Sequence, residues 1–303
     1  MRPALSALAR RRACLALMLS PALAGIPRAG AVAEGAAAGS SPSTSYLDRL
    51  RAFKSNLVVK GPAQPFKPTV PGAGTQEILY SSGALTLKAW AAFPAHASPS
   101  RKVPGVVFFH GGFAFAGSDF DAARPFLDAG FAVLCPMLRA ENGNPGYFEC
   151  LLGEIDDAGA AIEWLASQPN VDAARVYTFG HSIGGIVSAL LSLRPNGVRL
   201  GGSAGGLFGP RMFDKPWLKP HLPFAPAEDR REREMRVLIG NVPWMLHRHD
   251  AYVGVDDADQ ETDLAAREIQ PQPRLNIIKM PGDHITSLAP SMKAFIDTIK
   301  ADG

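Results

Sequence analysis

VYTFGHSIGG, residues 176–185, is the stretch that decides the fold. Four β-branched and aromatic residues precede Gly180, and an apolar run at 186–193 follows at once, so a strand is predicted to turn directly into a helix. A Gly-x-Ser-x-Gly sequence in that setting is the pattern of the nucleophile elbow. The turn forces Ser182 into a strained backbone conformation, which Gly180 and Gly184 permit because neither carries a side chain that would collide. We therefore expect the Ser182 hydroxyl at the tip of the strand, facing the N-terminus of the helix.

The sequence holds a second match to the same pattern. Residues 201–205 read GGSAG and have Ser203 at their centre. Residues 206–210, GLFGP, follow, and a helix does not begin with this combination of glycine and proline. We interpret Ser203 as a small residue at the end of a strand, and Ser182 as the nucleophile.

The first 33 residues differ in composition from the rest of the chain. Three arginines at 10–12 precede an apolar run at 13–19, and AVA at 31–33 matches an Ala-x-Ala cleavage site. This order is typical of a secretory signal peptide, and the apolar run is short for a membrane span. We predict a secreted or periplasmic protein that has lost residues 1–33 and has no stable membrane span. An uncleaved membrane anchor is the alternative.

The formal charge and the cysteines depend on the same segment. The chain has a net charge of +3, but residues 1–33 contain five arginines and no acidic residue, so the remainder carries −2. A nucleic-acid partner is therefore not expected. Of the three cysteines, Cys14 lies in the predicted signal peptide. Cys135 and Cys150 could form a disulfide in an oxidising compartment, or remain as two buried thiols.

The remaining residues divide into an arm and one domain. Residues 34–75 are rich in Ala, Gly, Ser and Pro, with one helix candidate at 46–53, and are predicted to form a linker and N-terminal arm. Residues 76–303 alternate apolar strands with helical segments, which predicts an α/β domain with a mostly parallel sheet. The predicted strands are 77–80 and 84–90, which form an antiparallel hairpin, and 105–109, 131–134, 176–179, 198–200, 251–255 and 275–280. The predicted helices include 154–167, 186–193 and 287–300.

Residues 207–249 form a long excursion between two of the predicted strands. Its first half combines prolines with aromatic residues, and it could cover the active site as a partial lid. Its second half contains a helix candidate of mixed charge at 227–235, which we interpret as a solvated face.

Two further motifs supply what a serine nucleophile needs. Residues 110–113, HGGF, directly follow a predicted strand, and their glycines let backbone amides approach a substrate closely. One donor of an oxyanion hole is expected from Gly112 or Phe113, and the other from Ile183 next to the nucleophile. His284 lies in a PGDH turn between the last strand and the last helix, and is the expected general base.

The other histidines are given different roles. His110 is expected to order the oxyanion loop, and His181 to point away from the site because it neighbours the nucleophile. His96 and His221 lie in proline-rich loops and are interpreted as surface residues.

His247 and His249 alternate along the chain, so on an extended strand they would share one face. No third histidine or cysteine follows at ligand spacing, and we predict neither a metal site nor a cofactor.

The third member of a catalytic triad is expected between Ser182 and His284 in the chain. Its carboxylate would hold the imidazole in one tautomer and stabilise the imidazolium. The strand predicted at 251–255 leads into DDAD at 256–259. The candidates are Asp257, which we choose, and then Asp256, Asp259 and Asp250.

Together these residues resemble the α/β-hydrolase superfamily, and within it the prolyl-oligopeptidase and dienelactone-hydrolase-like branch. The similarity covers about residues 103–300 and includes the loop RAENGNPGYF at 139–148. The resemblance implies an α/β-hydrolase fold, with a mostly parallel central sheet of about eight strands and helices on both faces. It also implies a triad of Ser182, an aspartate and His284.

The loop at 139–148 carries two substrate-binding candidates under this resemblance, Glu141 and Tyr147. The branch usually shows His-Gly-x-x-Asp around its acid, whereas this chain keeps only Gly254 and Asp257 of that pattern. The acid is therefore the member of the triad that the sequence constrains least.

These observations predict an exported serine hydrolase, carboxylesterase-like, that cleaves an ester or amide of a small molecule through an acyl-enzyme. One alternative is a serine peptidase of the prolyl-oligopeptidase type acting on short peptides. Another is a non-catalytic binding protein with the α/β-hydrolase fold. About 70 residues separate the predicted signal peptide from the first parallel strand, too few for a propeller domain. Glu141 is the lone acidic candidate for capturing a peptide amino terminus, so an ester is expected to be the better substrate.

Overall fold

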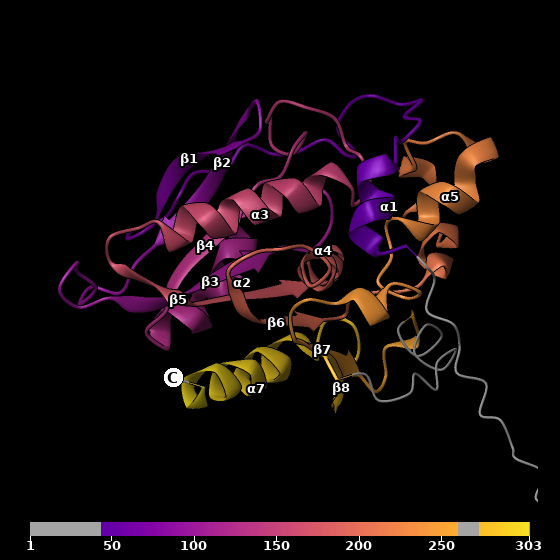
Figure 1. Cartoon of the computed structure of the whole chain (residues 1–303). Coiled ribbons are helices and arrows are strands. Elements are labelled where there is room, and N and C mark those ends of the chain that lie inside the picture. The colour runs from indigo at the N-terminus through magenta and orange to yellow at the C-terminus, as the bar shows by residue number, and fades with distance from the viewer. Residues whose placement is uncertain (1–43, 260–272, 303) are drawn as a thin grey trace, which may run out of the picture. The chain divides into compact units, whose positions relative to one another are not determined.

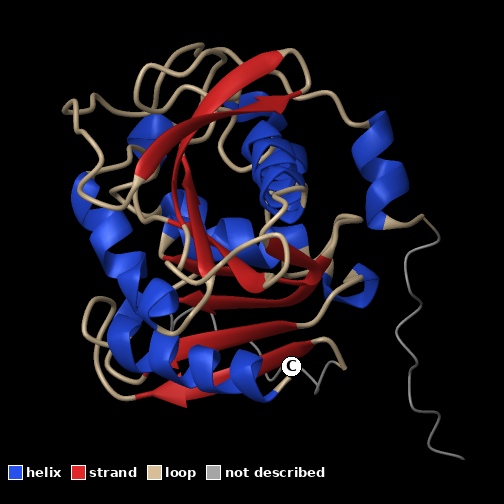
Figure 2. Cartoon of the chain, turned by 90° about the vertical axis from the view of Figure 1, so that its left-hand side faces the viewer, coloured by secondary structure: helices blue, strands red, loops and turns tan. Residues whose placement is uncertain are grey.

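The computed structural model describes residues 44–259 and 273–302, which are built around an eight-stranded sheet (Figures 1 and 2). The strands lie in the order β1-β2-β4-β3-β5-β6-β7-β8. They are β1 (Gln76–Ser82), β2 (Leu85–Ala92), β3 (Val103–Phe109), β4 (Ala132–Pro136), β5 (Val171–His181), β6 (Val198–Ala204), β7 (His249–Gly254) and β8 (Leu275–Met280). β2 pairs antiparallel with β1 and with β4, and the remaining pairs are parallel. The predicted mostly parallel sheet is confirmed.

Helices cover both faces of the sheet, as Figure 2 shows. Alternate residues of β3 point to opposite faces: Val107 belongs to one buried apolar cluster, whereas Val106 and Phe108 belong to another. The first cluster includes the apolar sides of α3 and α4, and the second those of α2 and α7. These helices are α2 (Gly117–Asp128), α3 (Gly153–Ala166), α4 (Ile183–Leu191) and α7 (Leu288–Ala301). Both faces of the inner strands β3, β4 and β7 are thus buried, which explains their continuous apolar sequences.

Helix α2 is the element that the sequence analysis did not include among its helices. Pro125 lies inside it, in its last turn, and a proline there removes a backbone donor that an interior helical residue would use. The helix forms because Phe120 and Phe126 bury their rings against the sheet. The free energy gained by burying these two aromatic side chains outweighs the cost of a proline inside the helix.

The N-terminal arm packs against the excursion at 207–249. Its helix α1 (Tyr46–Ala52) lies beside α5 (Asp229–Glu234) (Figure 1). The hydroxyl of Tyr46 donates to the carbonyl of Met235 (3.2 Å), and the amide of Val58 donates to the carbonyl of Pro223 (2.7 Å). Besides α5, the excursion contains short 3₁₀ turns at Pro210–Asp214, Lys219–His221, Pro226–Glu228 and Val242–Trp244.

The charged helix in the second half of the excursion is mostly exposed or partly exposed, as expected, but its Glu232 is buried. Glu232 and Arg236 are both buried and form an ion pair (2.5 Å) one turn apart. The same pair binds the arm, because Glu232 accepts from the amide of Asn56 (2.7 Å) and Arg236 donates to the hydroxyl of Ser55 (2.8 Å). Buried charges need such partners to offset the loss of water.

Cys135 and Cys150 are both free thiols, so the predicted alternative of a disulfide is wrong. Cys135 lies on β4 within the apolar cluster of α2 and α7, whereas Cys150 lies in the cluster of α3 and α4. The sheet separates the two side chains, and a disulfide needs them on the same side.

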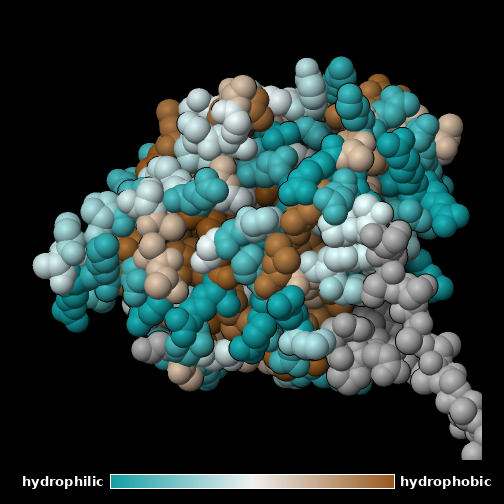
Figure 3. Space-filling model, viewed as in Figure 1, coloured by the Kyte–Doolittle hydropathy of each residue, from teal (hydrophilic) through white to brown (hydrophobic). Residues whose placement is uncertain are grey.

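The predicted signal peptide at 1–33 lies outside the described residues. None of the described helices has both the length and the apolar character needed to cross a membrane. The face drawn in Figure 3 mixes hydrophilic areas with smaller hydrophobic ones. That mixture is usual for a protein surface, much of which consists of apolar atoms.

Candidate active site

The elbow at Ser182 has the predicted strand–turn–helix geometry. β5 ends at His181, α4 begins at Ile183, and Ser182 between them has a φ of 55°. A Cβ atom at Gly180 would lie 2.0 Å from the carbonyl oxygen of Gly184, and a Cβ at Gly184 would lie 2.1 Å from the carbonyl oxygen of Phe109. The backbone can therefore turn this sharply only with glycine at both positions.

Three side chains form a hydrogen-bonded chain that ends at the elbow. His284 Nε2 lies 3.0 Å from Ser182 Oγ, and His284 Nδ1 lies 2.8 Å from Asp257 Oδ2. Since a carboxylate only accepts, Nδ1 carries the proton and Nε2 is free to accept from the serine hydroxyl. The hydrogen bond that His284 donates to Asp257 raises the pKa of His284, although partial burial acts in the opposite direction. The arrangement matches the geometry of a nucleophile, a base and an orienting acid.

The loop after β7 brings Asp257, and not the other candidate aspartates, to His284. Asp256 is exposed, Asp250 lies within β7, and Asp259 pairs with Lys215 instead. Asp257 itself is buried.

One close backbone approach and two hydrogen bonds set the position of this acid. A Cβ atom at Gly254 would lie 2.6 Å from the carbonyl oxygen of Gly282, so the loop that carries the acid packs directly on the loop that carries the base. The amide of Asp256 also donates to the Gly282 carbonyl (3.0 Å), and the amide of Asp259 donates to Asp257 Oδ1 (3.2 Å). Oδ2 of Asp257 is left to face His284.

A pocket of about 450 Å³ opens over Ser182. Its walls come from the elbow, the HGGF loop, the strand ends, the arm and the excursion. The lining residues are Gln64, Gly112, Phe113, Ser182, Ile183, Ile186, Gly205, Leu207, Trp217, His221, Asp259 and His284. A volume of this size suits a small organic substrate.

The three residues predicted for an oxyanion hole, Gly112, Phe113 and Ile183, all line this pocket. Gly112 has a φ of 72°, a left-handed conformation that favours glycine. Within residues 44–259 and 273–302, no hydrogen bond uses the amide of Phe113 or of Ile183, so both amides can still donate. Ile183 is the first residue of α4, where backbone amides have no partner within the helix.

His221 was expected at the surface, and it is partly exposed, but it also lines the pocket, which the sequence did not indicate. The excursion folds back over the site, so that His221 and Trp217 form part of the pocket wall. The ring centroids of His221 and Phe113 are 5.7 Å apart. Gln64 of the arm reaches the same pocket, and no feature of the sequence had identified it or Trp217 as individual lining residues.

His110, the first residue of the HGGF motif, is buried and does not line the pocket. Its Nε2 lies 3.1 Å from Glu141 Oε2, and its Nδ1 lies 2.9 Å from the carbonyl oxygen of Gly111. Burial alone would lower the pKa of His110, but the Glu141 carboxylate outweighs it and raises the pKa to about 9. A protonated ring donates from both nitrogens, and both have acceptors here. His110 therefore ties the HGGF loop to the loop after β4.

Neither substrate-binding candidate lines the pocket. Glu141 is buried, and besides His110 it binds the amide of Leu138 (2.8 Å). Tyr147 is 45% exposed, with the ammonium of Lys60 over its ring at 5.4 Å. The loop at 139–148 therefore acts on the site indirectly. Its Glu141 binds His110 of the HGGF motif, and neither Glu141 nor Tyr147 contacts the pocket.

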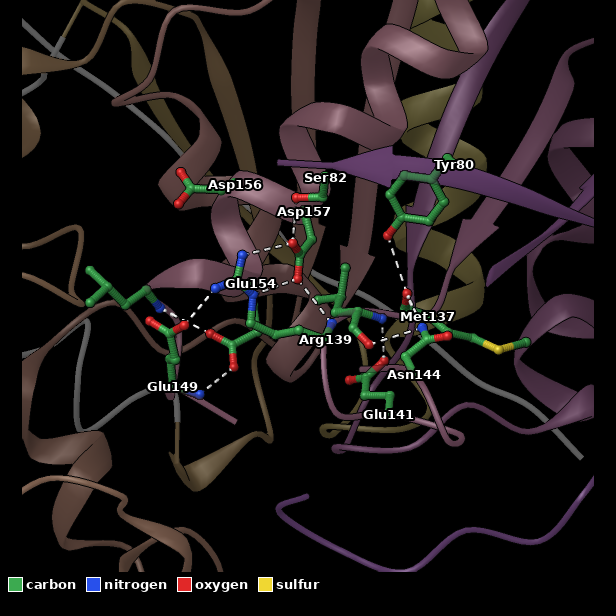
Figure 4. Close-up of polar contacts among 12 residues, drawn as sticks. Tyr80, Ser82, Met137, Arg139, Glu141, Asn144, Glu149, Glu154, Asp156 and Asp157 are labelled. Atoms are coloured by element: carbon green, nitrogen blue, oxygen red, sulfur yellow. Dashed lines mark hydrogen bonds and ion pairs between the residues drawn. The ribbon is translucent and has the colours of Figure 1, made fainter. Parts of the chain in front are cut away.

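That loop is held by a buried network around Arg139, drawn in Figure 4. Asp157 accepts from the main-chain N (2.9 Å), Nε (2.8 Å) and Nη2 (2.9 Å) of Arg139, and from the hydroxyl of Ser82 (2.6 Å). Nη1 of Arg139 binds Glu149 (2.5 Å), and a Cβ at Gly153 would lie 1.9 Å from this nitrogen. The motif at 139–157 is thus a structural clamp that fixes the loop against β1 and α3.

The second Gly-x-Ser-x-Gly match has no access to a substrate. Ser203 is 1% exposed at the end of β6, and its Oγ lies 2.8 Å from Nε2 of His249. Burial lowers the pKa of His249 to about 3, and its Nδ1 has no hydrogen-bond partner among the described residues. A buried serine–histidine pair without an acid or a pocket lacks what a nucleophile needs.

His247 does not join His249 in a common site, because its Nε2 binds the carbonyl of Arg194 (3.1 Å). The described residues include no group of three or more histidine, cysteine or acidic side chains that could hold a metal ion.

Comparison with known proteins adds sequence similarity to this geometry. The profile of the X-Pro dipeptidyl-peptidase (S15) family matches residues 57–200. The uncharacterized peptidase YtmA of Bacillus subtilis is 30% identical over 125 residues, which cover 40% of this chain and 46% of that protein. An uncharacterized protein of Mycobacterium tuberculosis, Rv2307c, is 31% identical over 134 residues, or 44% of this chain and 46% of its own length. The chain thus spans about half the length of the curated relatives it matches.

Solved structures share the fold at low sequence identity. A puromycin-hydrolyzing peptidase of Mycobacterium tuberculosis aligns with a TM-score of 0.62 and 19% identity, over 76% of this chain and 41% of that one. Porphyromonas gingivalis dipeptidyl peptidase 4 gives 0.60 and 21%, over 75% and 35%. The Pyrococcus furiosus esterase Pf2001 gives 0.57 and 14%, over 80% and 96%. The chain therefore has the α/β-hydrolase fold of these structures, and over residues 57–200 it is similar in sequence to the X-Pro dipeptidyl-peptidase family.

Proposed function

We propose that the protein hydrolyses small carboxylic esters through an acyl-enzyme formed on Ser182. The observation that carries this proposal is the chain from Asp257 through His284 to Ser182, which ends in a pocket lined by two amides with free N–H groups. A binding protein without catalytic activity would have no use for a serine held at a φ of 55° beside a base.

In the proposed reaction, Ser182 Oγ attacks the carbonyl carbon of the ester while Nε2 of His284 takes the hydroxyl proton. The carbonyl oxygen becomes an oxyanion and accepts hydrogen bonds from the amide of Ile183 and that of Gly112 or Phe113. Collapse breaks the bond to the alcohol, which leaves with the proton from His284. Water then attacks the acyl-enzyme in the same way, releases the carboxylic acid and restores Ser182.

Asp257 has two tasks in this cycle. Its carboxylate holds the proton of His284 on Nδ1, so that Nε2 faces the serine as an acceptor. It also stabilises the imidazolium that forms when the serine proton is transferred. The side chain is buried, which keeps this interaction out of water and strengthens it.

The walls of the pocket favour an ester with a small acyl group. Ile186, Leu207, Phe113 and Trp217 give an apolar lining, and its volume is about 450 Å³. The carboxylate that lines the pocket, Asp259, lies 2.7 Å from Lys215 Nζ, so its charge is already paired. These features suit an uncharged substrate better than the amino terminus of a peptide.

A peptidase is the second candidate, supported by the match to the X-Pro dipeptidyl-peptidase family over residues 57–200 and by the name of the Bacillus subtilis relative. The esterase hypothesis is supported by the extent of the structural match. The alignment covers 96% of the Pyrococcus furiosus esterase but only 35% of dipeptidyl peptidase 4. An ester also has the better leaving group, so a triad without a specialised amide site cleaves it faster.

The discriminating experiment compares kcat/KM for aryl esters of about two to six acyl carbons with that for dipeptidyl and prolyl aryl amides. We expect the esters to give the higher values. A dipeptidyl or prolyl amide that is the faster substrate would replace the esterase proposal with the peptidase one.

We also propose that the protein is exported, on the strength of the signal-peptide pattern in residues 1–33. Intact-mass spectrometry of exported protein should then find a chain that begins at or near Glu34. Exported protein that retains Met1 would favour the membrane-anchor alternative.

A further inference from the structure

His181, the residue before the proposed nucleophile, does not point away from the site as the sequence analysis expected. Its Nε2 lies 2.8 Å from the main-chain carbonyl oxygen of His284. A carbonyl oxygen only accepts, so the proton of this hydrogen bond belongs to Nε2 of His181. The elbow therefore contacts the base twice: Ser182 meets the ring of His284, and His181 meets its backbone.

The ring of His181 fills the space between three loops of the site. Its Nδ1 faces Gly111 of the HGGF loop, where an added Cβ would lie 3.4 Å away. Its Cδ2 faces Gly205 at the end of β6, where an added Cβ would lie 3.6 Å away. Its centroid is 5.0 Å from that of the His284 ring. The ring is thus enclosed on the sides where the oxyanion loop, the β6 end and the base approach the elbow.

The other hydrogen bonds of the base loop either join it to the loop after β7, where the carbonyl of Gly282 accepts from the amide of Asp256 (3.0 Å), or lie within its own turn. Asp283 Oδ1 accepts from the amides of Ile285 (3.0 Å) and Thr286 (2.8 Å), which closes the turn into α7. These bonds define the shape of the turn but do not connect it to β5. The hydrogen bond from His181 makes that connection, across 103 positions in sequence.

The charge state of His181 is compatible with this task. Burial lowers the pKa of His181, although the hydrogen bond to the His284 carbonyl partly opposes the shift. The ring is then neutral at neutral pH and adds no positive charge beside His284. A cation there would oppose the protonation of His284 that the reaction requires. Asp257 and Asp119 are the carboxylates that act on the His181 ring, and both favour its protonated form.

We propose that His181 is a positioning residue: its Nε2–H holds the backbone of His284 so that the imidazole stays within reach of Ser182 Oγ. The inference rests on the proposed function, because it assigns His181 a role in the same reaction. Loss of the donor should let the base loop drift, and a displacement of about 1 Å at a reacting group can cost about 10²-fold in rate.

The test compares His181→Gln with His181→Met, two side chains of similar length of which only Gln can donate a hydrogen bond. With an aryl ester as substrate, His181→Met is expected to lower kcat by about 10²-fold with KM changed less than about threefold. His181→Gln should recover most of that loss. Rates are expressed per site titrated with a fluorophosphonate, so that misfolded molecules do not count, and His181→Ala is a second donor-free variant should His181→Met not fold.

The pH profile separates positioning from simple loss of packing. A base that drifts from Asp257 loses part of the hydrogen bond that raises its pKa, so the acid limb of kcat/KM should move to lower pH in His181→Met and return in His181→Gln. His247→Met is the matched control, since Nε2 of His247 also binds a main-chain carbonyl, that of Arg194 (3.1 Å), but away from the pocket. It should leave both kcat and the acid limb unchanged.

The proposal is overturned if His181→Met keeps kcat within about threefold of the wild type, or if Gln and Met lose the same factor. Failure of the proposed function would give a different result. The wild-type protein itself would then hydrolyse neither esters nor amides, and the fluorophosphonate would not react at Ser182.

Discussion

Arg139→Met is expected to be one of the most destabilising single changes in this chain. The Arg139 side chain is 15% exposed and that of Asp157 is fully buried, so the pair lies largely out of water. Met keeps the aliphatic length and the main-chain N–H, but it removes the Nε and Nη2 bonds to Asp157 and the Nη1 bond to Glu149. Asp157 would then keep Ser82 and one amide as donors for a buried charge.

The size of the effect follows from that geometry. Removing one partner of a buried ion pair costs about 3–5 kcal/mol, mostly because the other charge is left without compensation. In a domain of this size each 1 kcal/mol lowers Tm by about 2–4 °C, which predicts a fall of about 6–20 °C for Arg139→Met. The substitution should also disturb the active site, because the loop held by Arg139 carries Glu141, the partner of His110.

The assay is thermal and denaturant unfolding followed by circular dichroism, with Arg124→Met as the matched control. Arg124 also pairs with an aspartate, Asp121, but both side chains are largely exposed on α2. Exposed pairs contribute about 0–1 kcal/mol, so the control should shift Tm by no more than about 4 °C. The assignment of Arg139 as a structural clamp would be refuted if the Tm of Arg139→Met lay within about 2 °C of the wild-type Tm, or equalled the Tm of the control.

The remaining predictions concern the charges of the site. Asp257→Asn should lower kcat about 10³–10⁴-fold with the fold intact, whereas Asn at exposed Asp256 should have little effect; the reverse order would move the acid by one residue. The bond to Asp257 raises the pKa of His284, so activity should fall as pH drops through a value above 6.5, and pH–rate profiles should show this acid limb at lower pH in Asp257→Asn. The pKa of His110 is about 9 in the folded protein, against an ordinary value of 6.5. Its ion pair with Glu141 therefore stabilises the folded state fully below about pH 6.5. On the order of 3 kcal/mol of the free energy of unfolding is lost as the pH rises through 9. Urea unfolding from pH 6 to 10 should show that fall in the wild type and a flatter curve in Glu141→Gln, and equal slopes would contradict the ion pair.

Much of the fold could be predicted because it follows from short-range patterns. The elbow at Ser182 needs a strand, two glycines and a helix within about ten residues, and all are adjacent in the sequence. The alternation of apolar strands with helical segments predicted the mostly parallel sheet, and the resemblance implied helices on both of its faces, as the two buried clusters confirm. The placement of His284 near Ser182 was implied by the resemblance to a known fold.

The roles of the other histidines depended on contacts that a sequence does not contain. His181 was expected to point away because it neighbours Ser182, but the sharp turn directs its ring toward the loop after β8. His221 was placed at the surface because prolines surround it, yet the excursion packs on the arm and brings it over the pocket. Long-range packing of irregular segments decides such positions.

The errors at Glu141 and Tyr147 have a common cause. The resemblance identified the correct loop, but its side chains divide between the interior and the surface according to the clamp at Arg139 and the pair with His110. A carboxylate that is fully engaged inside the protein cannot also bind a substrate. Only the structure shows which partner each side chain has taken.

The central claim is that Ser182 is the nucleophile, and covalent labelling tests it most directly. Protein treated with a fluorophosphonate and then digested should carry one phosphonyl adduct, on the peptide that contains Ser182, as read by tandem mass spectrometry. Ser182→Ala should abolish both the adduct and ester turnover, the latter by on the order of 10⁴-fold or more, whereas Ser203→Ala should retain labelling. An adduct on Ser203, or labelling that survives Ser182→Ala, would contradict the account.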